Sequence, residues 1–346
     1  MLKGIVIRIC GTVSLLLLSF SIACSQDAII NTPVKFMFYN VENLFDISDD
    51  TATDDDEFLP DGIRRWTYNK LARKTNLLYK TIVAAGEWTP PAIVALCEVE
   101  NRNLLNSLIY NTWLSKFNYD IIHQDSPDPR GIDVCLIYRR DMVKILNFRY
   151  FIPDGMTTEQ FTSRSVLYAK CLIFCDTIEL FVNHWPSRRG GVLAADDLRL
   201  KMAETVKNKA DSVLSSGNGE AKIIIMGDFN SSPDDQVMSI FTDKDGSGQA
   251  LVNLSDQLDE STGTFRYMGT WEMIDQVIVS DALINSDAGL YIGPAGLKIF
   301  RASFLLDDDP KYPGQGPLPT YRGYRYLGGC SDHLPVLIDL NMKPVF

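Results

Sequence analysis

Polar residues that directly follow short apolar runs carry most of the chemical information in the sequence. Three such runs end in Asn40-Val41-Glu42-Asn43, Glu98-Val99-Glu100-Asn101 and Asp228-Phe229-Asn230. In extended chain, residues i and i+2 share a face, so each segment should direct two polar groups to the same side. Carboxylates gathered at the ends of buried strands repel one another strongly unless a cation neutralises them. The spacing therefore predicts a divalent-cation site where these strand ends meet.

The available ligand atoms narrow the identity of that cation. Asn, Asp and Glu offer oxygen, whereas the chain contains only 3 histidines, too few for a zinc centre with several imidazole ligands. Mg²⁺ is therefore favoured, with Mn²⁺ as the alternative. Because Mg²⁺ keeps several waters and commonly binds phosphate oxygens, this ligand set indicates phosphoryl chemistry.

Two of the histidines have neighbours that suit such chemistry. His184 ends another apolar run and is followed by Arg188, while His333 directly follows Asp332. Imidazole donates well to phosphate oxygens and titrates near neutrality. We therefore expect His184 and His333 to have functional roles in contact with a phosphate. The third histidine, His123, has no comparable charged residue beside it in a motif, so we expect it to make a structural hydrogen bond.

The motif residues lie at the ends of predicted strands. Apolar runs predict strands at Val34–Tyr39, Ile93–Cys97, Asp133–Tyr138, Leu167–Phe174, Ile178–Val182, Lys222–Met226, Gln276–Val279 and Val336–Leu340. Stripes with helical spacing predict helices at Thr67–Ala85 and Ala194–Leu214. No repeat or long linker interrupts residues 30–346, so we expect one α/β domain. The acidic segment Asp49–Glu57 lacks calcium-loop spacing, which favours a solvated loop over a calcium site.

The first residues read as an export signal. Lys3 and Arg8 precede an apolar run at 13–20 that is too short for an ordinary membrane span. Residues 1–23 are therefore a predicted signal peptide. Either the chain is cleaved after Ala23, or a lipobox leaves Cys24 as a lipidated N-terminus that tethers it to a membrane. Both alternatives predict an extracytoplasmic protein, whether secreted, periplasmic or a lipoprotein of the outer membrane or cell surface.

The composition excludes few classes of protein, but it bears on which substrate the protein can bind. The chain is 46% hydrophobic and 22% charged, which is ordinary for a globular protein. Its net charge of −11 argues against a broad cationic footprint for duplex nucleic acid. A phosphate held by a metal and a few arginines is compatible with that charge. The cysteines after Cys24 lie mostly in apolar runs and form no disulfide framework.

Seven segments together resemble the endonuclease/exonuclease/phosphatase superfamily, which includes DNase I, abasic-site endonucleases, inositol polyphosphate 5-phosphatases and bacterial sphingomyelinases. They occur in the superfamily's order over residues 36–337. They are Asn40–Asn43, Glu98–Asn101, Arg130–Val134, Asn183–Ser187, Gly227–Asn230, Ile274–Gln276 and Ser331–Pro335. The acidic loop and the tryptophans Trp66, Trp88 and Trp271 are most similar to the extracytoplasmic bacterial branch. The resemblance implies a four-layer α/β sandwich, in which two mixed β-sheets pack face to face with helices outside, as in DNase I.

The resemblance also implies roles for individual residues. Glu98 would be the main Mg²⁺ ligand, assisted by Asn40 and Asp332. Asp228 would orient or deprotonate the attacking water, and Asn230 would hold the scissile phosphate. His333 would contact a phosphate oxygen and be oriented by Asp275. His184 would act from the other side with Asp133 as its carboxylate partner. Whether Asp228 or a histidine takes the proton of the water is left open.

Substrate contacts are predicted from the residues around these motifs. Arg188 could clamp a phosphate, and Trp271 could stack on a base or a lipid head group. The aromatic side chains of segments 267–271 and 321–326 fit two roles equally well: they could stack on the substrate, or they could pack against the rest of the protein.

The interpretation favoured by these observations is a Mg²⁺-dependent phosphodiesterase, with a nuclease acting on DNA or RNA as the leading form. A phosphomonoesterase or a sphingomyelinase-like phospholipase on the same scaffold is the alternative. A non-catalytic binding module would predict that a metal or histidine position is lost, and none is missing. We expect the protein to be a monomer.

Overall fold

Two six-stranded sheets form the centre of the protein. In the computed structural model, which describes residues 32–87, 89–187, 192–217, 219–242, 251–259, 261–286 and 288–343, neither sheet is purely parallel. Only the β1/β2 and β7/β8 pairs run parallel, and the other neighbours are antiparallel. The first sheet has the order β13 (Gly289–Ile299), β18 (Val336–Lys343), β1 (Val34–Leu44), β2 (Ile93–Val99), β4 (Asp133–Arg139), β3 (Tyr119–His123). The second has the order β5 (Lys144–Phe151), β6 (Val166–Ile173), β7 (Asp176–His184), β8 (Lys222–Asp228), β12 (Asp275–Val279), β9 (Val252–Asn253).

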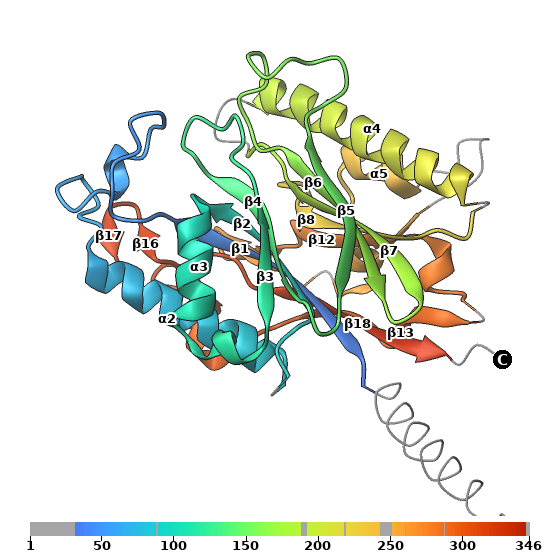
Figure 1. The fold of residues 1–346 in the computed structure, drawn as a ribbon. Helices are drawn as coiled ribbons and strands as arrows, with labels where there is room; N and C mark the ends of the chain where they lie inside the picture. The colour runs from blue at the N-terminus through green and yellow to red at the C-terminus, as the bar shows by residue number, and fades with distance from the viewer. Residues whose placement is uncertain are drawn as a thin grey trace, which may run out of the picture.

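Helices cover the outer face of each sheet (Figure 1). α2 (Tyr68–Ala85) and α3 (Arg102–Tyr110) lie on the first sheet, and α4 (Val192–Ser216) and α5 (Gln236–Thr242) on the second. The order of layers is helix, sheet, sheet, helix. The predicted four-layer α/β sandwich is therefore confirmed.

Three apolar clusters hold the layers together. One lies between the sheets and joins residues such as Phe38 and Ala95 to Leu180 and Val277. The others lie beneath the helices. β2 and β8 are buried along almost their whole length, which explains why they read as continuous apolar runs rather than alternating ones. Burial of each large aliphatic side chain contributes about 1.5–3 kcal/mol before entropy is counted.

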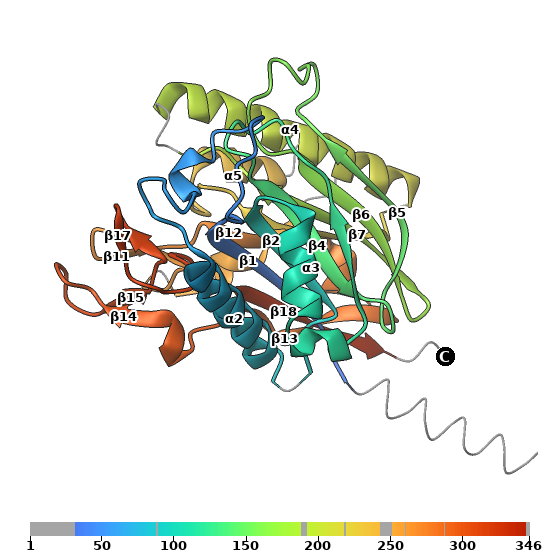
Figure 2. The same cartoon turned by 60° about the vertical axis from the view of Figure 1, so that its left-hand side comes forward.

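Three short ribbons stand beside the sandwich. β10 (Phe265–Tyr267) pairs with β11 (Thr270–Glu272), β14 (Leu306–Asp308) with β15 (Gln315–Pro317), and β16 (Tyr321–Arg322) with β17 (Arg325–Tyr326). Figure 2 shows β11, β14, β15 and β17 gathered on one side of the molecule. Phe45, Phe58, Trp66 and Tyr321 form an aromatic cluster that joins the last ribbon to the loop after β1.

All the predicted strands and both predicted helices are present, with ends shifted by a few residues. The elements that the sequence did not predict are mainly those at the margins. β5 is an edge strand with most of its residues exposed, and β13 is interrupted by a bulge between Ile292 and Leu297. Neither therefore shows the regular burial pattern of an inner strand.

Several predictions fall on residues that the structure does not describe. The signal peptide, Cys24 and Arg188 lie outside the described ranges. Within those ranges, no helix is long and apolar enough to cross a bilayer. The five described cysteines, at 97, 135, 171, 175 and 330, are free, as expected.

Candidate active site

Most of the predicted site residues that the structure describes meet at one edge of the two sheets. In the second sheet, His184 at the end of β7 pairs in register with Asp228 at the end of β8, and Asp228 pairs with Asp275 at the start of β12. Asn40 and Glu98 come from β1 and β2 of the first sheet, and Asp332 and His333 lie a few residues before the start of β18. Strands that face each other across the sandwich thus bring these side chains together.

Irregular backbone shapes this edge. β1 has a register shift between Asn40 and Leu44, and β2 has one between Cys97 and Val99. Glu98 has φ +64° and Asn230 has φ +47°, in the left-handed region that non-glycine residues rarely adopt. Each such residue costs about 1–3 kcal/mol and persists only where the surroundings impose it. The bulges interrupt the regular alternation predicted for these segments.

Glu42 and Glu100 consequently make backbone contacts. Glu42 accepts from the amides of Thr320 and Tyr321, at 2.7 and 3.3 Å. Glu100 accepts from the amide of Asp46 at 2.7 Å. Burial, together with the nearby carboxylate of Asp332, raises the pKa of Glu42 to about 8.

A compact group of side chains occupies the centre of the site. The side-chain nitrogen Nδ2 of Asn40 donates to Asp228 Oδ2 at 2.9 Å and to Glu98 Oε1 at 3.3 Å. His184 Nε2 lies 3.7 Å from both Glu98 Oε1 and Asp228 Oδ2. His333 Nε2 lies 3.9 Å from Asp228 Oδ2 and from Asp332 Oδ1. Asn40, Glu98, Asp228, Asp332, His184 and His333 therefore lie together, as predicted.

His333 is held by a carboxylate. Its Nδ1 lies 2.7 Å from Asp275 Oδ2, and its backbone amide donates to Ser331 Oγ at 3.0 Å. Burial alone would lower the pKa of His333, but the attraction of Asp275, Asp228 and Asp332 outweighs it and holds that pKa well above its usual value. Burial is the main cause that raises the pKa of Asp228 to about 7, with repulsion from Asp275 adding to it.

The predicted partner of His184 was wrong. Asp133 Oδ2 lies 3.0 Å from Nε2 of His123, which sits on the neighbouring strand β3, and Asp133 Oδ1 accepts from the amide of Ser126 at 2.7 Å. Its carboxylate is thus engaged within the first sheet. His184 Nδ1 instead accepts a hydrogen bond from Nε of Arg164, at 3.2 Å. Burial and the positive charges of Arg164 and Arg130 hold the pKa of His184 well below its usual value.

The donor set fits a hard divalent cation. Among the described residues, no lysine or arginine forms an ion pair with Glu98, Asp228 or Asp332, whose close partners are the imidazoles. The Asp332 side chain is 34% exposed, so the group opens to solvent on that side. Carboxylate oxygens that lack a lysine or arginine partner suit Mg²⁺ or Mn²⁺. Asn40 Oδ1 accepts from the amide of Glu42 at 2.9 Å, so its nitrogen, not its oxygen, faces the carboxylates.

Asn230 and Trp271 have different surroundings. The Asn230 amide donates to Asp228 Oδ1, and its side chain donates to the carbonyl of Trp185, both at 2.9 Å. Trp271 is half-buried, and the guanidinium of Arg301 lies 4.3 Å from its ring centroid. The substrate contacts of both residues stay predictions.

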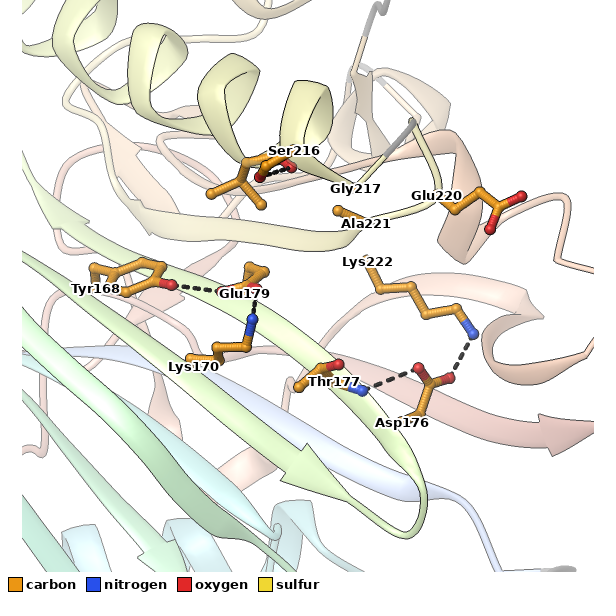
Figure 3. Close-up of a pocket in the computed structure, with 11 residues that line it drawn as sticks. Tyr168, Lys170, Asp176, Thr177, Glu179, Ser216, Gly217, Glu220, Ala221 and Lys222 are labelled. Carbon is orange, nitrogen blue, oxygen red and sulfur yellow. Dashed lines mark hydrogen bonds and ion pairs between the residues drawn. The ribbon is translucent and has the colours of Figure 1, made fainter.

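Two cavities border the site. One of about 240 Å³ includes Asp332 in its wall, with Phe265, Arg266 and Arg322 from the ribbons. Another of about 550 Å³ is acidic, and its wall includes Asp46, Glu100 and Asp128. A third, of about 390 Å³, lies near the opposite ends of β7 and β8 and is drawn in Figure 3. There Lys170 pairs with Glu179 and Lys222 with Asp176, so its lysines are neutralised.

Three buried cations near the site were not predicted. Arg164 contacts His184, Arg199 donates to the carbonyls of Pro186 and Asn230, and Lys74 donates to the carbonyl of Cys330. Arg164 and Arg199 lie outside the seven motifs, and Lys74 sits within a helix that reads as ordinary. Asp128 is the one residue close to a motif that could have pointed to any of these cations. It lies two residues before the motif at 130–134, and in the structure it forms an ion pair with Arg164.

Comparison with known proteins agrees with this arrangement. A sequence model described as the Endonuclease/Exonuclease/phosphatase family matches residues 35–342. No curated protein matches the chain.

Solved structures with the same fold cover 90% of this chain. An endonuclease/exonuclease/phosphatase family protein of Bacteroides thetaiotaomicron is 16% identical with a TM-score of 0.57, and 98% of it is covered. D. rerio TDP2, complexed with single strand DNA product, is 15% identical with a TM-score of 0.56, and a mannosyl-6-phosphatase of B. thetaiotaomicron is 16% identical with a TM-score of 0.56. Both are covered over 100% of their length. Identity this low shows a shared fold.

Proposed function

Because the chain belongs to the Endonuclease/Exonuclease/phosphatase family, we propose that it is a Mg²⁺-dependent phosphodiesterase that cleaves its substrate by in-line attack of water. One observation carries this proposal. The carboxylates of Glu98, Asp228 and Asp332 lie 3.7–3.9 Å from Nε2 of His184 or of His333, so side chains from both sheets meet at one edge.

The residues divide the work by charge. Mg²⁺ held by Glu98 and Asp332, with Asn40 beside them, would neutralise charge on the phosphate. His333, fixed by Asp275, donates Nε2–H to a phosphate oxygen, and His184 donates from the opposite side. Asp228 lies between the two rings and accepts the proton of the attacking water. Its pKa, raised to about 7, suits a general base at neutral pH.

A nuclease is the proposed form. The ribbon β16–β17 exposes Arg322, Tyr324 and Arg325 beside the cavity that contains Asp332. Cationic side chains interleaved with an aromatic ring suit the backbone and bases of a single strand. The structural similarity to TDP2 complexed with single strand DNA product is consistent with this substrate.

A phosphomonoesterase is the second candidate. The acidic cavity, with Asp46, Glu100 and Asp128 in its wall, would repel further phosphates of a long polyanion. A small phosphomonoester would avoid that wall. The structural similarity to a mannosyl-6-phosphatase is consistent with this alternative. We further propose that the protein acts as a monomer outside the cytoplasm, either free or tethered through Cys24.

The deciding experiment is a substrate panel with Mg²⁺, with Mn²⁺ and with EDTA. It comprises single-stranded and plasmid DNA, RNA, sugar phosphates, sphingomyelin and bis-p-nitrophenyl phosphate. Cleavage of nucleic acid that EDTA abolishes supports the nuclease, and release of phosphate from sugar phosphates alone supports the phosphomonoesterase. If neither metal gives hydrolysis of any ester, the proposed function is wrong.

A further inference from the structure

Each of the three guanidinium nitrogens of Arg164 makes a hydrogen bond next to His184. Arg164 is 5% exposed. Its Nε donates to His184 Nδ1 at 3.2 Å, one terminal nitrogen donates to Asp128 Oδ2 at 3.1 Å, and the other donates to the carbonyl of Trp185 at 2.6 Å. Three acceptors on three sides therefore fix the plane and position of this side chain.

Hydrogen-bond chemistry then assigns the proton of His184. A guanidinium has only donors and stays protonated in proteins, so the ring nitrogen that faces it must offer a lone pair. A neutral imidazole carries one N–H, which must then be on Nε2. We infer that Arg164 is a positioning residue that fixes His184 as the Nε2–H tautomer and aims that proton between Glu98 and Asp228.

The alternatives for His184 are unfavourable for a simple reason. An Nδ1–H, whether in the other neutral tautomer or in the doubly protonated ring, would set one donor against another in a buried site. Glu98 and Asp228, each 3.7 Å from Nε2, lie on the side where the remaining N–H points.

The two histidines of the site therefore differ in kind. Nδ1 of His333 faces the carboxylate of Asp275 at 2.7 Å, whereas Nδ1 of His184 faces a guanidinium. A carboxylate draws the Nδ1 proton toward itself, and a guanidinium excludes it. Within the proposed function, on which this role rests, Nε2 of His184 can then act only as a donor. His184 is thereby excluded as the acceptor for the proton of the water, a role that the proposed function gives to Asp228.

Asp128 anchors the arrangement. Its Oδ2 receives Arg164, and its Oδ1 lies 3.3 Å from Nε of Arg130, which is half exposed. Arg164 thus lies between the carboxylate of Asp128 and the ring of His184, so Nδ1 of His184 has a guanidinium as its partner and not a carboxylate.

Nitrogen NMR of the imidazole rings tests the inference without any turnover. The chain has only 3 histidines, so ¹⁵N-histidine labelling gives a readable spectrum, and His184→Gln identifies the signals of His184. At pH 7 in EDTA, wild-type His184 should show a protonated Nε2 and an unprotonated Nδ1. In Arg164→Met the two tautomers should mix, while the signals of His123 and His333 stay unchanged. Arg164→Lys keeps the positive charge but lacks the planar set of guanidinium donors, so it should lose part of the Nε2–H population of His184. This variant provides the test if Arg164→Met does not fold.

Two results would overturn the inference. One is a wild-type His184 that carries its proton on Nδ1, and the other is a tautomer that is unchanged in whichever arginine variants fold. Where a substrate is found, Arg164→Met should lower kcat by about 10- to 100-fold with little change in KM. The spectrum does not require activity, so absence of hydrolysis would count against the proposed function and leave the assignment of His184 to be decided by NMR.

Discussion

At the scale of single residues, the site sets apart two imidazoles that the sequence presents as equivalent. His333 has a carboxylate beside Nδ1 and a pKa well above its usual value, whereas His184 has a guanidinium there and a pKa well below it. Both histidines follow the same pattern in the sequence, because each lies beside an apolar run that predicts a strand and each has polar residues next to it. The difference comes from which tertiary neighbour reaches each ring.

The first prediction concerns His333 and Asp228. His333→Ala removes a donor to the phosphate, and Asp228→Asn removes the proposed proton acceptor. Each should lower kcat by about 10²- to 10⁴-fold, because general acid–base groups contribute on this order. Steady-state hydrolysis of the best ester in the panel measures the effect, and circular dichroism verifies the fold.

His123→Gln is the matched control for these variants. His123 is buried like the other two, but it contacts Asp133 and lies away from the site. Its replacement should leave kcat within about twofold, as expected when no group of the site is altered. A large loss in the control, or near-normal rates in His333→Ala, would contradict the roles assigned here.

Residue patterns predicted part of this site and missed part of it. Asp332 and His333 are adjacent, and the run that follows them begins β18, so their joint placement could be predicted from the sequence. The contact of Arg164 with His184 could not, because Arg164 lies in the loop before β6 and no motif surrounds it. For the same reason Asp133 was assigned to the wrong histidine, since its true partner on β3 is set by strand pairing.

At the scale of elements, the parallel pair β7 and β8 holds His184 beside Asp228. Gly227 permits this, because a Cβ added there would lie 2.3 Å from the carbonyl oxygen of Asn183 on β7. Gly227→Ala should therefore push the strand ends apart and reduce kcat by at least about tenfold, since small misplacements of reacting groups are costly. Kinetics together with thermal unfolding measures this.

Gly155→Ala provides the comparison for that variant. Gly155 has a positive φ but nothing within 4 Å of an added Cβ. It should lose some stability from backbone strain and keep its kcat. Equal kinetics in the two alanine variants would show that the close approach of β7 and β8 does not position the site.

A second prediction at this scale concerns a group of charged side chains on β1, β13 and β18. Asp339 of β18 binds Lys35 of β1 at 3.0 Å and Lys298 of β13 at 2.8 Å. Burial would raise the pKa of Asp339, but the two lysines outweigh it and lower that pKa. A carboxylate whose folded pKa is depressed stabilises the fold above its unfolded pKa of about 4, and that stability is lost as pH falls through the folded value.

Asp339→Asn should therefore reduce the free energy of unfolding by about 1 kcal/mol at pH 7. The difference from wild type should shrink as the pH falls below about 4 and through the lowered pKa of Asp339, where the folded wild-type carboxylate also becomes neutral. Urea unfolding at pH 7 and pH 3 measures both values. A difference that stays constant over this range would mean that lost packing, and not lost charge, causes the effect.

Elements were predictable where burial is complete. β2 and β8 are buried on both faces and gave unbroken apolar runs. β5 exposes most of its residues, and β13 is broken by a bulge, so neither carried a regular pattern. The bulges that place Glu98 and Asn40 could not be predicted either, because they depend on how β1, β2 and β4 register with one another.

At the scale of the whole molecule, part of the acidic balance of the chain lies at the candidate site. The net charge is −11, and it includes the carboxylates of Glu98, Asp228 and Asp332, with which no described lysine or arginine forms an ion pair. Holding these groups together in the folded protein without a cation opposes folding. A metal that binds the native site and not the unfolded chain should relieve that repulsion and shift the unfolding equilibrium.

Mg²⁺ should therefore stabilise the protein specifically. At 100 times the dissociation constant, binding to the folded state alone adds about 2.7 kcal/mol, which corresponds to a rise in Tm of about 4 °C for a domain of this size. Glu98→Gln should abolish the Mg²⁺-dependent rise, yet its Tm in EDTA should equal or exceed that of the wild type, because one repelling carboxylate is gone. Calorimetric scans in EDTA, in Mg²⁺ and in NaCl of matched ionic strength separate site binding from general screening. An equal rise in NaCl, or a full rise in Glu98→Gln, would show that Mg²⁺ acts on the surface charge of the protein and not through the carboxylates at the sheet edge.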